Sequence, residues 1–155
     1  CVNFALAGLK YKPDIVISGV NEGPNLGSDI MYSGTVAACF QALKYEIPGI
    51  AISKSYEPIS NLQEQVSRVL SYIISEKIHS NKYVLNVNIP SGKNEKKYVF
   101  TKPLMFKFET NAHIILNTFS YSRNIITENI PGSDFYEFQN NNISISKIKL
   151  NYNFE

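Results

Sequence analysis

Helical and strand-like hydrophobic patterns alternate along the first 90 residues of the chain. Apolar residues recur at helical spacing in three segments, and three short apolar runs fit strands that are buried on both faces of a parallel sheet. The order helix, strand, helix, strand, helix, strand is typical of an α/β domain. The predicted helices are residues 1–11, 34–45 and 60–79, and the predicted strands are residues 14–19, 49–55 and 82–90.

The helical spacing also predicts which side chains face the core. Ser60 and Gln63 have the spacing of a capping box, which would start the third helix at its N-terminus. Cys39 lies inside the second helix, where a free cysteine behaves as a small buried hydrophobe. The predicted buried faces are Val2, Ala5, Leu6 and Leu9 in the first helix, Val36, Phe40 and Leu43 in the second, and Leu62, Val66, Val69, Leu70, Ile73 and Ile74 in the third.

Beyond Ser91 the pattern changes to extended, aromatic-rich runs such as KKYVFTKPLMFKF. We expect antiparallel strands or hairpins in this part of the chain. The asparagine run at residues 140–142 is predicted to be a hairpin turn, because isoleucines at 143, 145 and 148 flank it. The chain therefore divides into a core α/β part, about residues 1–90, and an extended or hairpin part, about residues 91–155, within a single domain.

Composition and charge exclude several classes of partner. The 155 residues include 44% hydrophobic and 18% charged residues, as in ordinary globular domains. A net charge of +2 is too balanced to indicate a nucleic acid polymer or an anionic membrane as partner. The two cysteines indicate no disulfide framework, so a reducing compartment, the cytoplasm, is expected. The chain opens on Cys1 within a helical pattern, and we interpret it as an internal piece of a longer protein.

One glycine-rich stretch, SGVNEGPNLGSDIMYSGTVAA at residues 18–38, stands between a predicted strand and a predicted helix. Connections of this kind usually take about two to six residues, and this one is too rich in small residues to pack a core. Ligands of open α/β sheets bind outside the carboxyl ends of the strands. Asn21 is at such an end, where its amide can offer an oxygen to a hard cation or an N–H to an anion. The alternative is that Asn21 only braces its own loop.

The tetrapeptide YSGT closes this stretch, with Ser33 or Gly34 beginning the next helix. Free N–H groups and the helix dipole make such a terminus an anion site, and the hydroxyls of Ser33 and Thr35 add donors. The alternative is ordinary N-capping by Ser33. The stretch matches neither the P-loop pattern, whose lysine is missing, nor the dinucleotide-binding G-x-G-x-x-G pattern.

Taken together, these motifs resemble a known family. The run PDIVISGVNEGPNLGSDIMYSGTVAA is similar to the signature of the SurE family (survival protein SurE) of metal-dependent 5′/3′-nucleotidases: a strand, SG[IV]N, a loop with NLG, then YSGTVAA. IPGIAIS and VLNVNIP have counterparts in the same order, and PGSDFYEFQNNNISISKIKL resembles a degraded form of the closing TDF and SIT segment. The resemblance is tight to about Pro90 and looser afterwards. It implies a three-layer, Rossmann-like α/β fold with a mostly parallel sheet and a C-terminal β-hairpin extension.

The resemblance also implies a reaction. SurE proteins hydrolyse phosphomonoesters, chiefly nucleoside monophosphates, with one divalent cation, so Mg²⁺ or Mn²⁺ is the expected cofactor. By resemblance, Asn21 becomes a metal ligand and Ser33, Gly34 and Thr35 become phosphate-binding residues. These two roles are chemically consistent: a cation activates the attacking water, and a helix N-terminus stabilises the negative charge that develops on the phosphoryl group.

The chain departs from the family in its acidic residues. The NDDG turn and the serine that complete the family's metal site are absent. Only Asp14, Asp29 and Asp134 are present, with no adjacent pair. We interpret Asp14 as a turn residue and Asp29 as a solvated or loop-bracing residue. A hard cation needs several anionic oxygens. No catalytic residue is therefore assigned within the chain; the acidic ligands are expected upstream, and the chain alone is expected to be inactive.

Two functions remain open at this point. The complete protein is a 5′-nucleotidase, or it is a non-catalytic relic of the fold that serves in assembly or weak phosphate binding. SurE proteins form dimers or tetramers through the hairpin extension, so a homodimer or homotetramer is expected, with residues from about 100 to 155 in the contact. The alternative is that the aromatic residues of this segment pack on the chain's own sheet. They are Phe106, Phe108, Phe119, Tyr121, Phe135, Tyr136 and Phe138.

Overall fold

A five-stranded sheet forms the centre of the computed structural model, which describes residues 1–92, 96–105, 107–126 and 129–149. Three of the four strand pairs are parallel, and only the pair of β3 with β7 is antiparallel. The prediction of an α/β fold with a mostly parallel sheet is therefore confirmed. The strand order is β1 (Val16–Glu22), β2 (Gly49–Lys54), β3 (Val84–Ile89), β7 (Ile143–Ile148) and β4 (Tyr98–Thr101).

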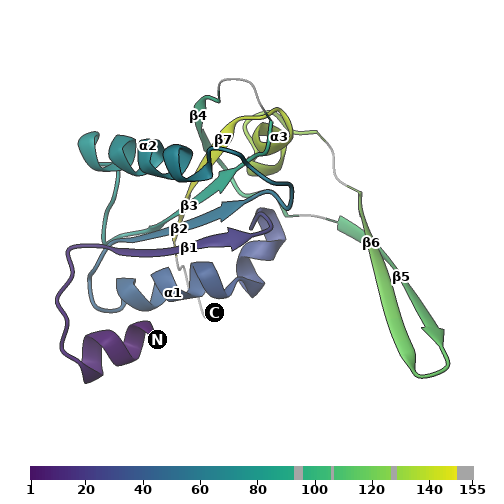
Figure 1. Ribbon diagram of the computed structural model, residues 1–155, viewed down its shortest axis with the longest axis horizontal. Coiled ribbons are helices and arrows are strands. Elements are labelled where there is room, and N and C mark those ends of the chain that lie inside the picture. The colour runs from purple at the N-terminus through teal and green to yellow at the C-terminus, as the bar shows by residue number, and fades with distance from the viewer. Residues whose placement is uncertain (93–95, 106, 127–128, 150–155) are drawn as a thin grey trace, which may run out of the picture.

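The two longest helices cover opposite faces of this sheet (Figure 1). α2 (Leu62–Ser75) lies on one face, and α1 (Gly34–Leu43) lies on the other. Successive residues of a strand point to opposite faces, so β2 contributes Ile50 and Ile52 to the α2 side and Ala51 to the α1 side. No helix of the described residues is long and apolar enough to cross a membrane.

The contact between α1 and the sheet requires a glycine. A Cβ atom on Gly49 of β2 would stand 2.7 Å from Cβ of Cys39, which is closer than non-bonded carbon atoms approach in proteins. Cys39 is fully buried at this contact, and burial raises the pKa of its thiol to about 12. Its predicted role as a small buried hydrophobe is confirmed.

Two predicted helices differ from the structure. The first is only a short π-helix, Phe4–Gly8, in which Leu6 is the one buried residue while Leu9 is 50% exposed. The third begins at Leu62, and the predicted capping box of Ser60 and Gln63 does not form. Asn61 holds the N-cap position, and its side chain accepts a hydrogen bond from Gln65 instead of a backbone N–H.

The buried face of α2 follows the prediction except at one position. Val69 and Ile73 are fully buried, and Leu62, Val66 and Leu70 pack partly buried against the same cluster. Ile74, in contrast, is 51% exposed.

β1 is less buried than predicted. Ile17 is 46% exposed, and exposed residues recur along the strand. The reason is its position: β1 is an edge strand in the described sheet, with β2 as its neighbour on one side only. A parallel strand in the middle of a sheet would be covered on both faces.

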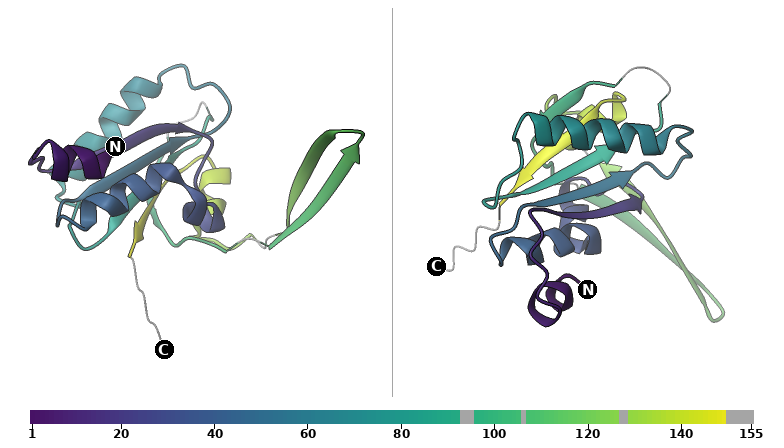
Figure 2. Two further views of the ribbon diagram at one scale, coloured as in Figure 1. Left: turned by 90° about the horizontal axis from the view of Figure 1, so that it is seen from below. Right: turned by 60° about the vertical axis from the view of Figure 1, so that its left-hand side comes forward.

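The second half of the chain combines a hairpin with two further strands of the main sheet. β5 (Lys107–Ile115) and β6 (Thr118–Ile126) pair antiparallel and extend away from the body as an arm, which confirms the predicted hairpin (Figure 2). β4 and β7, however, pair parallel. The asparagine run at residues 140–142 does not turn a hairpin; it links α3 (Asp134–Gln139) to β7, with Asn141 at a positive φ of 64°.

The close approach at Gly49 predicts a specific loss of stability. Gly49→Ala is expected to lower the free energy of unfolding by about 1–3 kcal/mol, because the added methyl group overlaps Cys39. Gly34→Ala is the matched control, since nothing lies within 4 Å of its added Cβ. Urea denaturation of both variants measures the difference, and equal midpoints would contradict the assigned contact.

Candidate functional site

A long connection between β1 and α1, here called the site loop (residues 23–33), lies at the carboxyl ends of the parallel strands (Figure 1). It contains a 3₁₀ helix, η2 (Gly27–Tyr32). Its middle is buried: Leu26 is 4% exposed, and Ile30 packs into the core under α1. The expectation that this stretch cannot pack a core is therefore wrong. Although most residues of the loop are small or polar, Leu26 and Ile30 are buried and anchor it.

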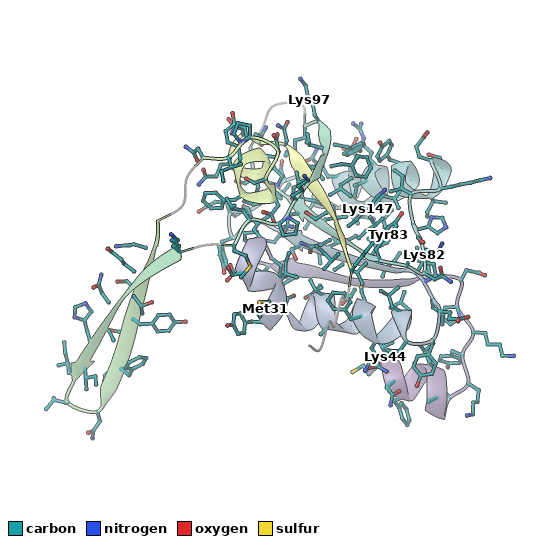
Figure 3. The ribbon with its side chains drawn as sticks, turned by 180° about the vertical axis from the view of Figure 1, so that it is seen from behind. Met31, Lys44, Lys82, Tyr83, Lys97 and Lys147 are labelled. Atoms are coloured by element: carbon teal, nitrogen blue, oxygen red, sulfur yellow. The ribbon has the colours of Figure 1, made fainter. Side chains whose placement is uncertain are left out.

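The outer part of η2 faces solvent. Met31 is 71% exposed and Tyr32 is 82% exposed. Figure 3 shows Met31 on the side of the body from which the hairpin arm extends. The site loop thus has a buried inner side and an open outer side.

Asn21 lies near the end of β1 and is half-buried. Its Nδ2 donates a hydrogen bond to the carbonyl oxygen of Gly23 at 2.7 Å, so the loop-bracing alternative is realised. Because Nδ2 makes this bond, Oδ1 is the side-chain atom that remains for another interaction. Within the described part of the chain, no hydrogen bond to this oxygen is formed. Asn21 can therefore brace the loop and still offer an oxygen to a ligand.

The start of α1 combines a cap with an open backbone. Oγ of Ser33 accepts a hydrogen bond from the N–H of Val36 at 3.1 Å, which is the predicted N-capping. Gly34 is exposed, and the space where a Cβ would stand is open. The N–H groups of a first helical turn have no partners within their own helix. Ser33 therefore sets the helix start, while Gly34 and Thr35 leave backbone donors accessible to an anion.

A buried polar cluster beneath the site loop was not predicted from the sequence. The N–H of Asn25 donates to Oδ1 of Asn88 at 2.8 Å, and its carbonyl oxygen accepts from Nδ2 of Asn86 at 2.8 Å. Its own Nδ2 donates to Oγ of Ser53 at 2.7 Å. Asn86 and Asn88 are fully buried in β3. The sequence did carry a sign of this cluster: two asparagines stand in the otherwise apolar strand VLNVNI, and buried polar side chains require hydrogen-bond partners.

Asp134, at the start of α3, was also missed as a site residue. It is fully buried, and its Oδ2 accepts a hydrogen bond from the N–H of Gly27 at 2.7 Å. Its Oδ1 accepts from the N–H groups of Leu104 at 3.0 Å and Phe135 at 2.9 Å. Burial raises the pKa of this carboxyl group, and the backbone donors act in the opposite direction.

The described residues do not form a divalent-cation site by themselves. Asp14 is exposed in a bend, and Asp29 is half-buried in the first turn of η2. No group of three His, Cys, Asp or Glu residues in the described ranges is placed to hold a metal ion. Asn21 has one side-chain oxygen to offer, whereas a hard cation takes six or more.

Comparisons with known proteins agree with this geometry. The family model for survival protein SurE matches residues 1–110, which is most of the chain. The chain belongs to the SurE family. The resemblance inferred from the SGVN and YSGT motifs is thus confirmed.

Relatives and a solved structure extend the comparison. The SurE chain is 47% identical over 94 residues to "5′-nucleotidase SurE" of Thermoanaerobacter sp. (strain X514), covering 59% of this chain and 37% of the relative. For the protein of the same name from Variovorax paradoxus, the identity is 40% over 96 residues, covering 59% and 38%. The SurE protein of Aquifex aeolicus has a crystal structure that matches with a TM-score of 0.76 and 30% identity, over 97% of this chain and 66% of that one. The matched part therefore spans well under half of the curated relatives.

Proposed function

We propose that the protein is a phosphomonoester hydrolase acting on nucleoside monophosphates, a 5′-nucleotidase, and that this chain supplies the phosphate-binding part of its site. The observation that supports this most directly is the convergence of Asn21 and the start of α1 at one end of the sheet, joined by an anchored loop. The names of the curated relatives support the same reaction.

In this proposal the phosphate binds at the N-terminus of α1. Gly34 lets the phosphate oxygens approach the backbone, because no side chain fills the space there. The N–H groups of the first turn and the hydroxyl of Thr35 donate to those oxygens, and the helix dipole favours their negative charge. Ser33 contributes mainly by capping, since its Oγ is engaged with Val36.

The proposal includes a divalent cation, Mg²⁺ or Mn²⁺, with Oδ1 of Asn21 as one ligand. The free Oδ1 supports this role. The other ligands of the cation are proposed to lie outside the described residues, which hold no group of three His, Cys, Asp or Glu residues placed to bind a metal ion. We also propose a cytoplasmic location, in keeping with two cysteines that form no disulfide.

The lack of such a cluster among the described residues is also compatible with a second candidate, a non-catalytic relic that binds phosphate weakly or serves in assembly. The two candidates differ in what the complete protein does to a phosphate ester. The enzyme hydrolyses it, and the relic does not.

Asn21→Ala in the complete protein is expected to weaken metal binding by at least about 10-fold, because even residues that only orient a metal's ligands contribute that much to affinity. The hydrolysis of p-nitrophenyl phosphate, titrated with Mn²⁺ or Mg²⁺, measures this. Asn81→Ala, at an exposed turn outside both the site and the hairpin arm, is the control. The metal-ligand role is wrong if saturating metal restores none of the lost rate.

Residues 1–155 alone, purified free of contaminating phosphatases, are expected not to hydrolyse p-nitrophenyl phosphate. The reason is that Asn21 cannot hold a cation without acidic partners. Turnover by this piece would show that the described residues are sufficient and that the division of the site is wrong. A lack of turnover leaves the enzyme candidate in place for the complete protein.

We further propose that the hairpin arm mediates self-association into a homodimer or homotetramer. Phe119 and Tyr121 of β6 are 64% and 65% exposed, and Leu116 at the tip is 94% exposed. Apolar and aromatic side chains of this kind are enriched at the centres of interfaces. Phe106 and the side chain of Phe108 lie outside the described residues. Phe135, Tyr136 and Phe138 are half-buried in and around α3.

Light scattering of the complete protein at micromolar concentration is expected to give a dimer or larger. The double variant Phe119→Ser/Tyr121→Ser is expected to shift the mass toward the monomer, because it removes apolar surface from the arm. Tyr11→Ser removes a similarly exposed ring, 64%, from the N-terminal part of the chain and leaves the arm unchanged, so it is the control. A monomeric parent protein would refute the proposed assembly.

A further inference from the structure

The site loop is bound on its buried side by the carboxylate of Asp134, which comes from a distant part of the chain. Asp134 stands 107 positions after Gly27, whose N–H it binds at 2.7 Å. The same carboxylate binds the N–H of Leu104, ahead of the hairpin arm, and that of Phe135 in α3. Three segments of the chain are thereby joined at one fully buried side chain.

A carboxylate suits this place better than any side chain of similar size. Both of its oxygens accept hydrogen bonds, and all three neighbours are donors. An asparagine would present an NH₂ group to at least one of these N–H groups. A buried donor left without a partner costs about 1–3 kcal/mol.

The bond to Gly27 acts on the site because Gly27 leads directly into the start of α1. Gly27 has a φ of +47° and begins η2. η2 then runs through Tyr32 into Ser33, the cap of α1, and the N–H of Ser33 is bound to the carbonyl oxygen of Ile30. A continuous 3₁₀ helix therefore connects the Gly27 peptide to the start of α1.

The neighbouring residue Asn25 is fixed separately. Its backbone is bound to Asn86 and Asn88 of β3, so only Leu26 separates the two attachment points. Asn25 fixes the loop to the sheet that carries Asn21. Asp134 fixes the part of the loop that leads to Ser33, Gly34 and Thr35.

We propose that Asp134 is a positioning residue of the phosphate site: through Gly27 it places the N-terminus of α1 relative to Asn21. This inference rests on the proposed phosphatase function and names a further residue on which that site depends. Asp134 itself touches no substrate, since it is fully buried beneath the loop.

Ser133 offers a matched control for any loss of stability. It is 4% exposed, and its Oγ accepts a hydrogen bond from the N–H of Tyr136 at 3.1 Å, which caps the same helix. It makes no hydrogen bond to the site loop in the described structure. Ser133→Ala therefore weakens α3, by about 1 kcal/mol for a lost cap, without releasing Gly27.

The test compares Asp134→Asn with Ser133→Ala in the complete protein. Asp134→Asn is expected to lower kcat/KM for p-nitrophenyl phosphate by up to about 100-fold, the effect of a misplacement of about 1 Å. Inhibition by inorganic phosphate is expected to weaken in parallel, because the anion site is displaced. Ser133→Ala is expected to stay within about twofold of the parent in both measurements, in keeping with a lost cap of about 1 kcal/mol that does not reach the site.

Amide hydrogen exchange provides a readout that does not depend on activity. Exchange at Gly27 and at the first turn of α1 is expected to be faster in Asp134→Asn than in Ser133→Ala. If the parent protein has no phosphatase activity, the proposed function fails. Binding of inorganic phosphate, followed by NMR, then decides the inference: weaker binding by Asp134→Asn than by Ser133→Ala supports it, and equal binding, or none by the parent, overturns it.

Equal kcat/KM for Asp134→Asn and Ser133→Ala would overturn the inference while leaving the proposed function standing. If Asp134→Asn does not fold, Asp134→Glu takes its place, since it keeps the charge but moves the oxygens by one methylene. Misfolding of both, with Ser133→Ala folded, would assign Asp134 a purely structural role and overturn the inference as well.

Discussion

The hydrogen bonds of Asn25 to β2 and β3 are the interaction on which the site depends most. Both backbone polar atoms of Asn25 and its Nδ2 are paired with buried side chains, Asn86, Asn88 and Ser53. Polar groups in such surroundings are costly when unpaired and strongly directional when paired. This cluster fixes the path of the site loop on the sheet.

The parallel sheet determines where that fixed loop has to be. Because β1, β2 and β3 are parallel, their carboxyl ends share one edge (Figure 1), and Asn21, Ser53 and Asn88 all lie toward it. The chain leaves β1 there and returns through α1, which begins at the same edge with its positive dipole end. An oxygen ligand and an anion-binding helix end are thereby brought together by topology.

The second half of the chain completes this arrangement. β7, which follows the hairpin arm, lies antiparallel beside β3, and β4, which precedes the arm, joins the sheet by pairing with β7. The two ends of the arm are tied together by the N–H of Lys102 to the carbonyl of Gly132 and the N–H of Asp134 to the carbonyl of Lys102. The base of the arm and the support of the site loop therefore share Asp134.

Local pattern was sufficient to predict α1, β2, β3 and the hairpin, because the periodicity of side chains along one segment reflects burial of that segment. The motifs SGVN and YSGT were sufficient to predict the family. Tertiary structure alone decided that β1 is an edge strand of the described sheet, with Ile17 exposed. It also decided that Asn61, and not Ser60, holds the N-cap position of α2. It also decided the pairing of Asp134 with Gly27, because a hydrogen bond between residues 107 positions apart depends on how α3 docks and leaves no periodic trace in the sequence of either segment.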